Sequence, residues 1–91
     1  MKRAFALEIA EMVLIFLANR PEEIERFLTA SGLDVGELRA RMDDPAILSA
    51  ALNFLAGNES LAEEFSKDQN LKPGQLLHAL ATLDPHGSSA W

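Results

Sequence analysis

The chain nearly repeats itself at a separation of thirty-eight residues, and this restricts its possible folds more than any other feature. Residues 14–18 (LIFLA) align with residues 52–56 (LNFLA), and the alignment continues without a gap. It gives ten identities over residues 9–42, where this Leu- and Ala-rich composition would give roughly three by chance. The first-copy members of these pairs are Ile9, Leu14, Phe16, Leu17, Ala18, Glu25, Phe27, Leu33, Gly36 and Leu38. The repeat predicts two copies of one helical unit that share a core.

Helix signals recur in both copies, and no segment alternates as a strand would. The expected helices cover residues 4–18, 21 to just before Gly32, Asp34 to Met42, 45–56, Asn58 to Asn70, and 73–83. We therefore predict an all-α fold with one six-helix domain over residues 1–83. Its two three-helix units, about 4–42 and 45–83, should close on each other about a pseudo-two-fold axis, with the first helix of each unit at the centre. A loosely held tail should follow at residues 84–91.

The ends of these helices carry specific local signals. Gly32 should end its helix in the left-handed conformation, with Leu33 packing back over the last turn. Asn70 aligns with Gly32, and Asn is the second-best residue for that conformation. The repeat therefore predicts the same backbone geometry in both copies. Side-chain caps are expected from Asp34, Asp44 and Asn58.

Size and charge limit the classes of partner. The chain has 91 residues, a net charge of −6 and no cysteine. It is one domain, without disulfides or thiolate metal sites, and its acidity argues against both nucleic acid and anionic membrane surfaces as partners. The apolar run at residues 12–18 is far shorter than the ~20 residues that a membrane span needs. We expect a cytoplasmic protein that lies on no membrane.

Residues that could carry chemistry are few. His78 and His86 are the only histidines, and neither has a second ligand at metal-binding spacing. We interpret His78 as a solvated surface residue on the face opposite the leucines of its helix. The acidic residues lack the cleft and orienting partner of a catalytic pair, so we predict no enzyme activity, no cofactor and no metal site. They are expected instead to form surface ion pairs, namely Glu22 with Arg26, Glu37 with Arg41, and Glu63 with Lys67.

The first helix differs from its counterpart in a way that bears on function. Residues 12–15 (MVLI) make it apolar nearly all round, whereas Asn53 aligns with Ile15. One interpretation is a central helix that is buried on every side; the other is a partly exposed helix that contacts a partner. The core-facing residues are expected to include Phe5, Ile9, Val13 and Phe16 in this helix, and Leu38 and Met42 in the third.

Trp91, the only tryptophan, ends the tail after a Gly-Ser-Ser segment. Its side chain could dock on its own domain, anchor in a partner's pocket, or have no role. The candidate protein-contact residues of this sequence are Met12, Ile15 and Trp91.

A family resemblance is carried by residues 16–18 (FLA), 21–22 (PE), 26–28 (RFL), 32–34 (GLD), 38–41 (LRAR), 44–45 (DP) and 52–55 (LNFL). These segments resemble a small alphaproteobacterial family known only as a domain of unknown function. The resemblance covers the chain up to about Leu83 and leaves the tail outside. It implies a short, intracellular, all-helical protein and supplies no catalytic or binding residues.

Taken together, the sequence predicts a non-enzymatic protein–protein interaction or adaptor module whose partner is another protein or a second copy. The runner-up is a DNA-associated regulator that uses the helices at residues 34–42 and 45–56, although the second of these offers only Ser49 and Asn53 to bases or phosphates. A third class is a small-ligand binder with its cavity between the two units.

Overall fold

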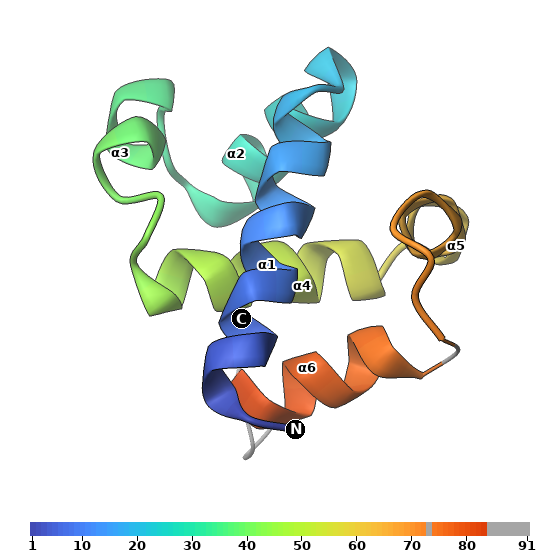
Figure 1. Ribbon diagram of the computed structural model, residues 1–91. Coiled ribbons are helices and arrows are strands. Elements are labelled where there is room, and N and C mark those ends of the chain that lie inside the picture. Colours follow the sequence, from blue (N-terminus) through green and yellow to red (C-terminus); the bar gives the residue numbers. More distant parts are fainter. Residues whose placement is uncertain (73, 84–91) are drawn as a thin grey trace.

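The computed structural model describes residues 1–72 and 74–83, and within them it is entirely helical, without strands. The elements follow one another as α1 (Arg3–Ala18), α2 (Pro21–Ser31), α3 (Val35–Ala40), α4 (Pro45–Ala56), α5 (Glu59–Asp68) and α6 (Gln75–Leu83) (Figure 1). The predicted all-α, single-domain fold with six helices is confirmed. The predicted tail, residues 84–91, lies outside the described part of the chain.

Local sequence signals account for where these helices begin. The side chains of Asp34, Asp44 and Asn58 accept hydrogen bonds from the backbone N–H groups of residues 37, 46 and 61, at 2.7, 2.9 and 3.2 Å. These bonds satisfy donors that have no partner within the first turn of a helix. Pro21 and Pro45 occupy first helical positions, where a missing N–H costs nothing. All three predicted caps are confirmed.

The ends of α2 and α5 share one backbone geometry. Gly32 has φ 76° and Asn70 has φ 55°, so both residues are left-handed as predicted. After each, the next N–H turns back onto the helix: Leu33 N donates to the Leu28 carbonyl at 3.2 Å, and Leu71 N donates to the Ser66 carbonyl at 2.8 Å. This six-to-one bond is the Schellman pattern.

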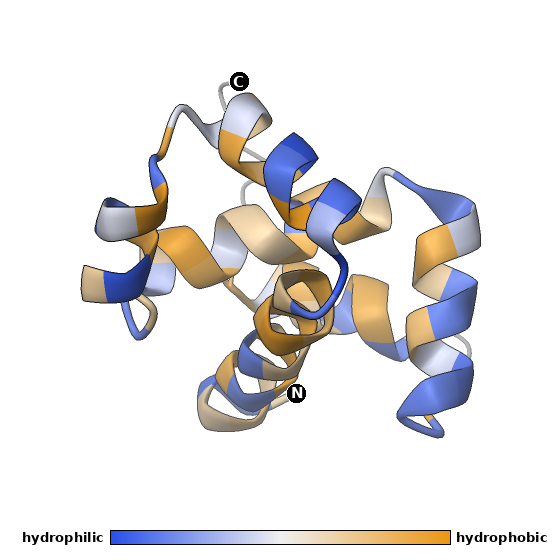
Figure 2. Ribbon diagram, turned by 90° about the horizontal axis from the view of Figure 1, so that it is seen from above, coloured by the Kyte–Doolittle hydropathy of each residue, from blue (hydrophilic) through white to orange (hydrophobic). Residues whose placement is uncertain are grey.

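The core lies where α1, α4 and α6 meet. α1 packs against both α4 and α6, and α4 and α6 also pack against each other, while α2 and α5 flank this centre. Every fully buried side chain among the described residues is apolar. Figure 2 shows the same organisation in α5, at the right of the view, where hydrophobic residues face inward and hydrophilic residues face out. The largest completely buried side chains are Ile9, Val13, Leu14, Leu17, Phe27, Leu48, Leu52, Leu55 and Phe65.

Two aromatic contacts relate the halves of the chain. The Phe16 ring of α1 meets the Phe65 ring of α5 edge to face, with centroids 5.3 Å apart. The Phe27 ring of α2 meets the Phe54 ring of α4 in the same way, at 5.6 Å. Phe54 and Phe65 align with Phe16 and Phe27, so each second helix meets the first helix of the other half through equivalent residues.

The third helices do not follow this equivalence. α3 has six residues and makes only slight contact with other helices, whereas α6 has nine and packs against both α1 and α4. The two halves therefore agree in their helix order and in selected contacts but differ in packing. The arrangement of two closed copies about a pseudo-two-fold axis stays a prediction.

Several expected details are wrong. Met42 is 39% exposed because α3 ends at Ala40 and leaves Met42 in the following turn. Phe5 is 43% exposed because it lies at the border between the buried face of α1 and its outer face. α6 begins at Gln75, two residues after the expected start at Pro73, which is itself outside the described residues.

The ion pairs also differ from those expected. Arg26 pairs with Glu23 at 3.2 Å instead of Glu22, and Arg41 pairs with Asp44 at 2.7 Å instead of Glu37. Both observed pairs join residues three apart. Glu63 and Lys67 form no ion pair in the part of the chain that the structure describes.

Candidate functional site

The outer face of α1 carries an apolar stripe. Phe5, Met12 and Ile15 lie on it because residues spaced by three, four or seven along a helix share one side. Ile15 is 55% exposed and Phe5 is 43% exposed, while Met12 is partly buried. Glu8, also exposed, interrupts the stripe. The interpretation that this helix is buried on every side is therefore wrong at Ile15, and the helix is partly exposed.

The stripe borders a groove between the C-terminal halves of α1 and α5, which we call the α1 groove. It has a volume of about 400 Å³. Two of the predicted contact residues, Met12 and Ile15, thus lie together, whereas Trp91 lies outside the described residues. The groove is lined by Met12, Ile15, Phe16, Asn19, Arg20, Asp68 and Gln69.

Arg20 lines the α1 groove and contacts residues on both sides of it in the sequence. Its guanidinium lies over the Phe16 ring, 4.2 Å from the centroid, and its Nη2 donates to Oε1 of Glu64 at 2.8 Å. The two side chains of this ion pair are 37% and 50% exposed, so water screens it, and such pairs contribute at most about 1 kcal/mol. Sequence reasoning missed Arg20 because its partner lies forty-four residues away. No spacing rule for neighbours on one helix could have found it.

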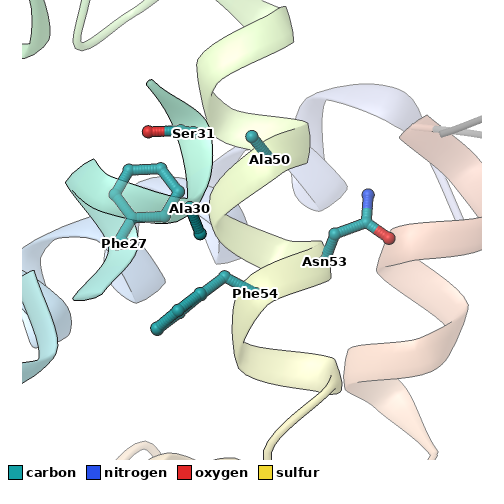
Figure 3. A pocket seen from close by; sticks show the side chains of 6 residues that line it. All are labelled: Phe27, Ala30, Ser31, Ala50, Asn53 and Phe54. Atoms are coloured by element: carbon teal, nitrogen blue, oxygen red, sulfur yellow. The ribbon is translucent and has the colours of Figure 1, made fainter. Parts of the chain in front are cut away.

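A second groove lies between α2 and α4, and we call it the aromatic groove. It is smaller, about 280 Å³, and the edge-to-face rings of Phe27 and Phe54 form part of its lining. Figure 3 shows side chains from both helices around it. The lining residues are Phe27, Ala30 and Ser31 of α2, with Ala50, Asn53 and Phe54 of α4.

Polar groups elsewhere are engaged in structural contacts. His78 is exposed as predicted, and its Nε2 lies 3.3 Å from the amino nitrogen of Met1. The hydrogen bonds from Arg41, together with that from the Ala46 N–H, hold the pKa of Asp44 below its ordinary value of 3.8. Within residues 1–72 and 74–83, no three side chains of the metal-binding types converge. The α1 groove and the aromatic groove therefore offer a binding partner apolar contact and hydrogen bonding.

Comparison with known proteins places nearly the whole chain in one group. Residues 3–86 match the family described as "Protein of unknown function (DUF3572)". The match extends a few residues past Leu83, where the resemblance was expected to end. No curated protein and no solved structure shows significant similarity to the chain. Among the described helices, none combines the length and the apolar character needed to cross a membrane.

Proposed function

Since the chain belongs to the DUF3572 family, for which no function is described, we propose from its surface that it is a small non-enzymatic module for protein–protein interaction. The observation that carries this proposal is the exposure of Ile15 beside a groove, on a helix whose other large apolar side chains are mostly buried. Removing exposed apolar groups of this kind from water stabilises a complex by roughly 25 cal/mol per Å² of buried apolar surface.

The shape of the stripe suits a helical or strand-like partner segment. From Phe5 to Ile15 it extends about 15 Å along the axis of α1, at 1.5 Å per residue. A partner helix could lay an apolar face against it, with side chains spaced three, four and seven residues apart. The partner is another protein or a second copy of this chain, bound in the cytoplasm.

Ile15→Glu tests this role directly. The substitution places a charge in the stripe without removing a buried group, so the fold should survive while association is lost. Val35→Glu is the matched control, because Val35 is also β-branched, is 52% exposed, and lies outside both grooves. The measurements are the sedimentation-derived mass of each purified protein and the identity of proteins and nucleic acid retained by each tagged protein from its native cell.

Loss of one stoichiometric partner, or of the dimer, in Ile15→Glu alone would support the proposal. A monomer that retains the same proteins with either substitution would overturn it, since Ile15 would then contribute to no contact.

Small-ligand binding ranks second, and the aromatic groove is the observation that favours it. This groove lies between helices of the two predicted units, where a ligand site was expected. Its volume of about 280 Å³ is near the lower end for ligand pockets, and Ser31 and Asn53 are its only polar side chains. A survey of small molecules by protein NMR, with shifts read at Ala30 and Ala50, would detect such a ligand.

The arrangement of α4 argues against the DNA-binding alternative. A reading helix must project from the protein surface into a groove of the duplex. α4 instead packs against α1, α2, α5 and α6, and the Asn53 amide already donates to the Ser49 carbonyl at 3.1 Å. We therefore do not propose nucleic acid as a partner.

A further inference from the structure

Five of the residues that line the aromatic groove align in the repeat with residues that line the α1 groove. Each groove lies beside an edge-to-face pair of phenylalanine rings at equivalent places in the repeat, but both rings line the aromatic groove whereas only Phe16 lines the α1 groove. The four positions around the rings carry a smaller side chain in the aromatic groove than in the α1 groove. These differences are Ala50 for Met12, Asn53 for Ile15, Ala30 for Asp68, and Ser31 for Gln69. The aromatic groove is thus the counterpart of the α1 groove, with smaller side chains around its rings.

The cover of the rings differs as well. In the α1 groove the Arg20 guanidinium lies over Phe16. The residue that aligns with Arg20 is Asn58, whose side chain caps α5 by accepting from Leu61 N and does not line the aromatic groove. Within the described residues, therefore, no side chain lies over the Phe54 ring as Arg20 lies over the ring of Phe16. Phe54 is partly exposed, so its ring offers apolar surface to an added group.

The lining specifies the chemistry of that group. No charged residue lines the aromatic groove, so an ionic group would lose its hydration there without gaining a partner. Asn53 stands at the edge of the groove nearest α6 (Figure 3). Its amide nitrogen donates to Ser49, and its Oδ1 accepts no hydrogen bond within the described residues. A neutral aromatic group such as an indole suits the rings, and its single N–H donor needs only one acceptor at the rim of the groove.

The chain itself contains one large aromatic side chain with a donor, since it has one tryptophan and no tyrosine. We propose that the aromatic groove is the docking site of Trp91 on the tail that follows α6. The tail's eight residues can span up to about 26 Å, and α6, from which they start, packs along α4. A group tethered by so short a segment has an effective concentration on the order of millimolar, which favours it over a free competitor.

The fluorescence of the intact chain provides the test, because Trp91 is its only tryptophan and it has no tyrosine. In the native protein we expect emission at shorter wavelength, and weaker quenching by acrylamide, than in the same chain unfolded in urea. The double substitution Ala50→Met, Asn53→Ile copies the residues of the α1 groove and fills the site. It should shift the emission to that of exposed indole, whereas the matched control Ala4→Met, at an exposed position of α1, should leave it unchanged.

Native emission equal to that of the unfolded chain would overturn the proposal, because Trp91 would then be in water. A short-wavelength emission that stays unchanged in the double variant would also overturn it, since Trp91 would then be buried elsewhere. An emission wavelength that depends on protein concentration would overturn it as well, since Trp91 would then be buried between two copies of the chain. Should the double variant fail to fold, nuclear Overhauser contacts in the unmodified protein decide the matter. The indole protons must then show contacts to the methyl groups of Ala30 and Ala50. If these contacts are absent, the proposal is wrong.

Discussion

Asp44 combines two roles in one partly exposed carboxylate. One oxygen, Oδ1, accepts from Ala46 N and caps α4, and the other, Oδ2, accepts from Nε and Nη2 of Arg41 at 3.1 and 2.7 Å. Arg41 lowers the pKa of Asp44 first by these hydrogen bonds, and the backbone bond adds to the effect. The folded state therefore prefers the charged form more than the unfolded state does.

Asp44→Asn should lower the midpoint of thermal unfolding at neutral pH, because it keeps an N-cap but removes the charged partner of Arg41. A carboxylate with a depressed folded pKa contributes stability above its unfolded pKa and loses that contribution as pH falls through the folded value. The gap between the two proteins should thus be constant above pH 5 and narrow as the pH falls below 3.8. Thermal melts across this range check it. The control is Asp43→Asn at the exposed neighbouring carboxylate, and an equal effect there would contradict this account.

Residues such as Asp44 also show which contacts a sequence can predict. A cap depends on positions two or three residues apart, so Asp34, Asp44 and Asn58 were predicted correctly. Ion pairs between long exposed side chains have several acceptors within reach and small differences in free energy between them. For that reason the expected pairs of Arg26 and Arg41 were wrong, and Arg20, whose partner is distant in sequence, was missed.

At the scale of helices, the left-handed residues after α2 and α5 allow a clean prediction. A Cβ added at Gly32 would meet no atom within 4 Å, so Gly32→Ala changes only the backbone preference. It should lower the free energy of unfolding by roughly 1–2 kcal/mol, and Asn70→Ala should do the same to a lesser degree because Asn already bears a Cβ. Urea titration measures both effects.

Gly57→Ala is the control for this pair, since Gly57 follows α4 with φ −77° and its added Cβ would make only ordinary contacts. There the substitution should stabilise the protein by about 0.4–1 kcal/mol by restricting the unfolded chain. A loss at Gly57 as large as the loss at Gly32 would show that backbone handedness is not the cause.

Helix order and most helix ends could be predicted because they depend on signals within a few residues. Exposure could not be predicted to the same degree. Periodicity marks an apolar face but not which neighbour covers it, so Met42 and Phe5 were placed inside and Ile15 was left with two interpretations. Likewise the two grooves depend on pairs such as α2 with α4, which the repeat suggests only after the structure shows which helices meet.

At the scale of the whole molecule, the aromatic contacts join the two halves, and we expect them to make the chain one cooperative unit. Phe27 and Phe65, each almost completely buried, reach from their own half to a ring in the other. Phe27→Leu and Phe65→Leu should each lower the free energy of unfolding by roughly 1–2 kcal/mol, since an edge-to-face pair contributes about 0.5–1.5 kcal/mol beyond its buried area.

Amide hydrogen exchange distinguishes a stability shared by the two halves from a separate stability of each half. In a shared core, either substitution reduces protection in α1 and α4 alike, and the variants unfold in one transition. Protection lost only in the substituted half, or a biphasic transition, would mean that each half is stable by itself and that the repeat joins two nearly independent units.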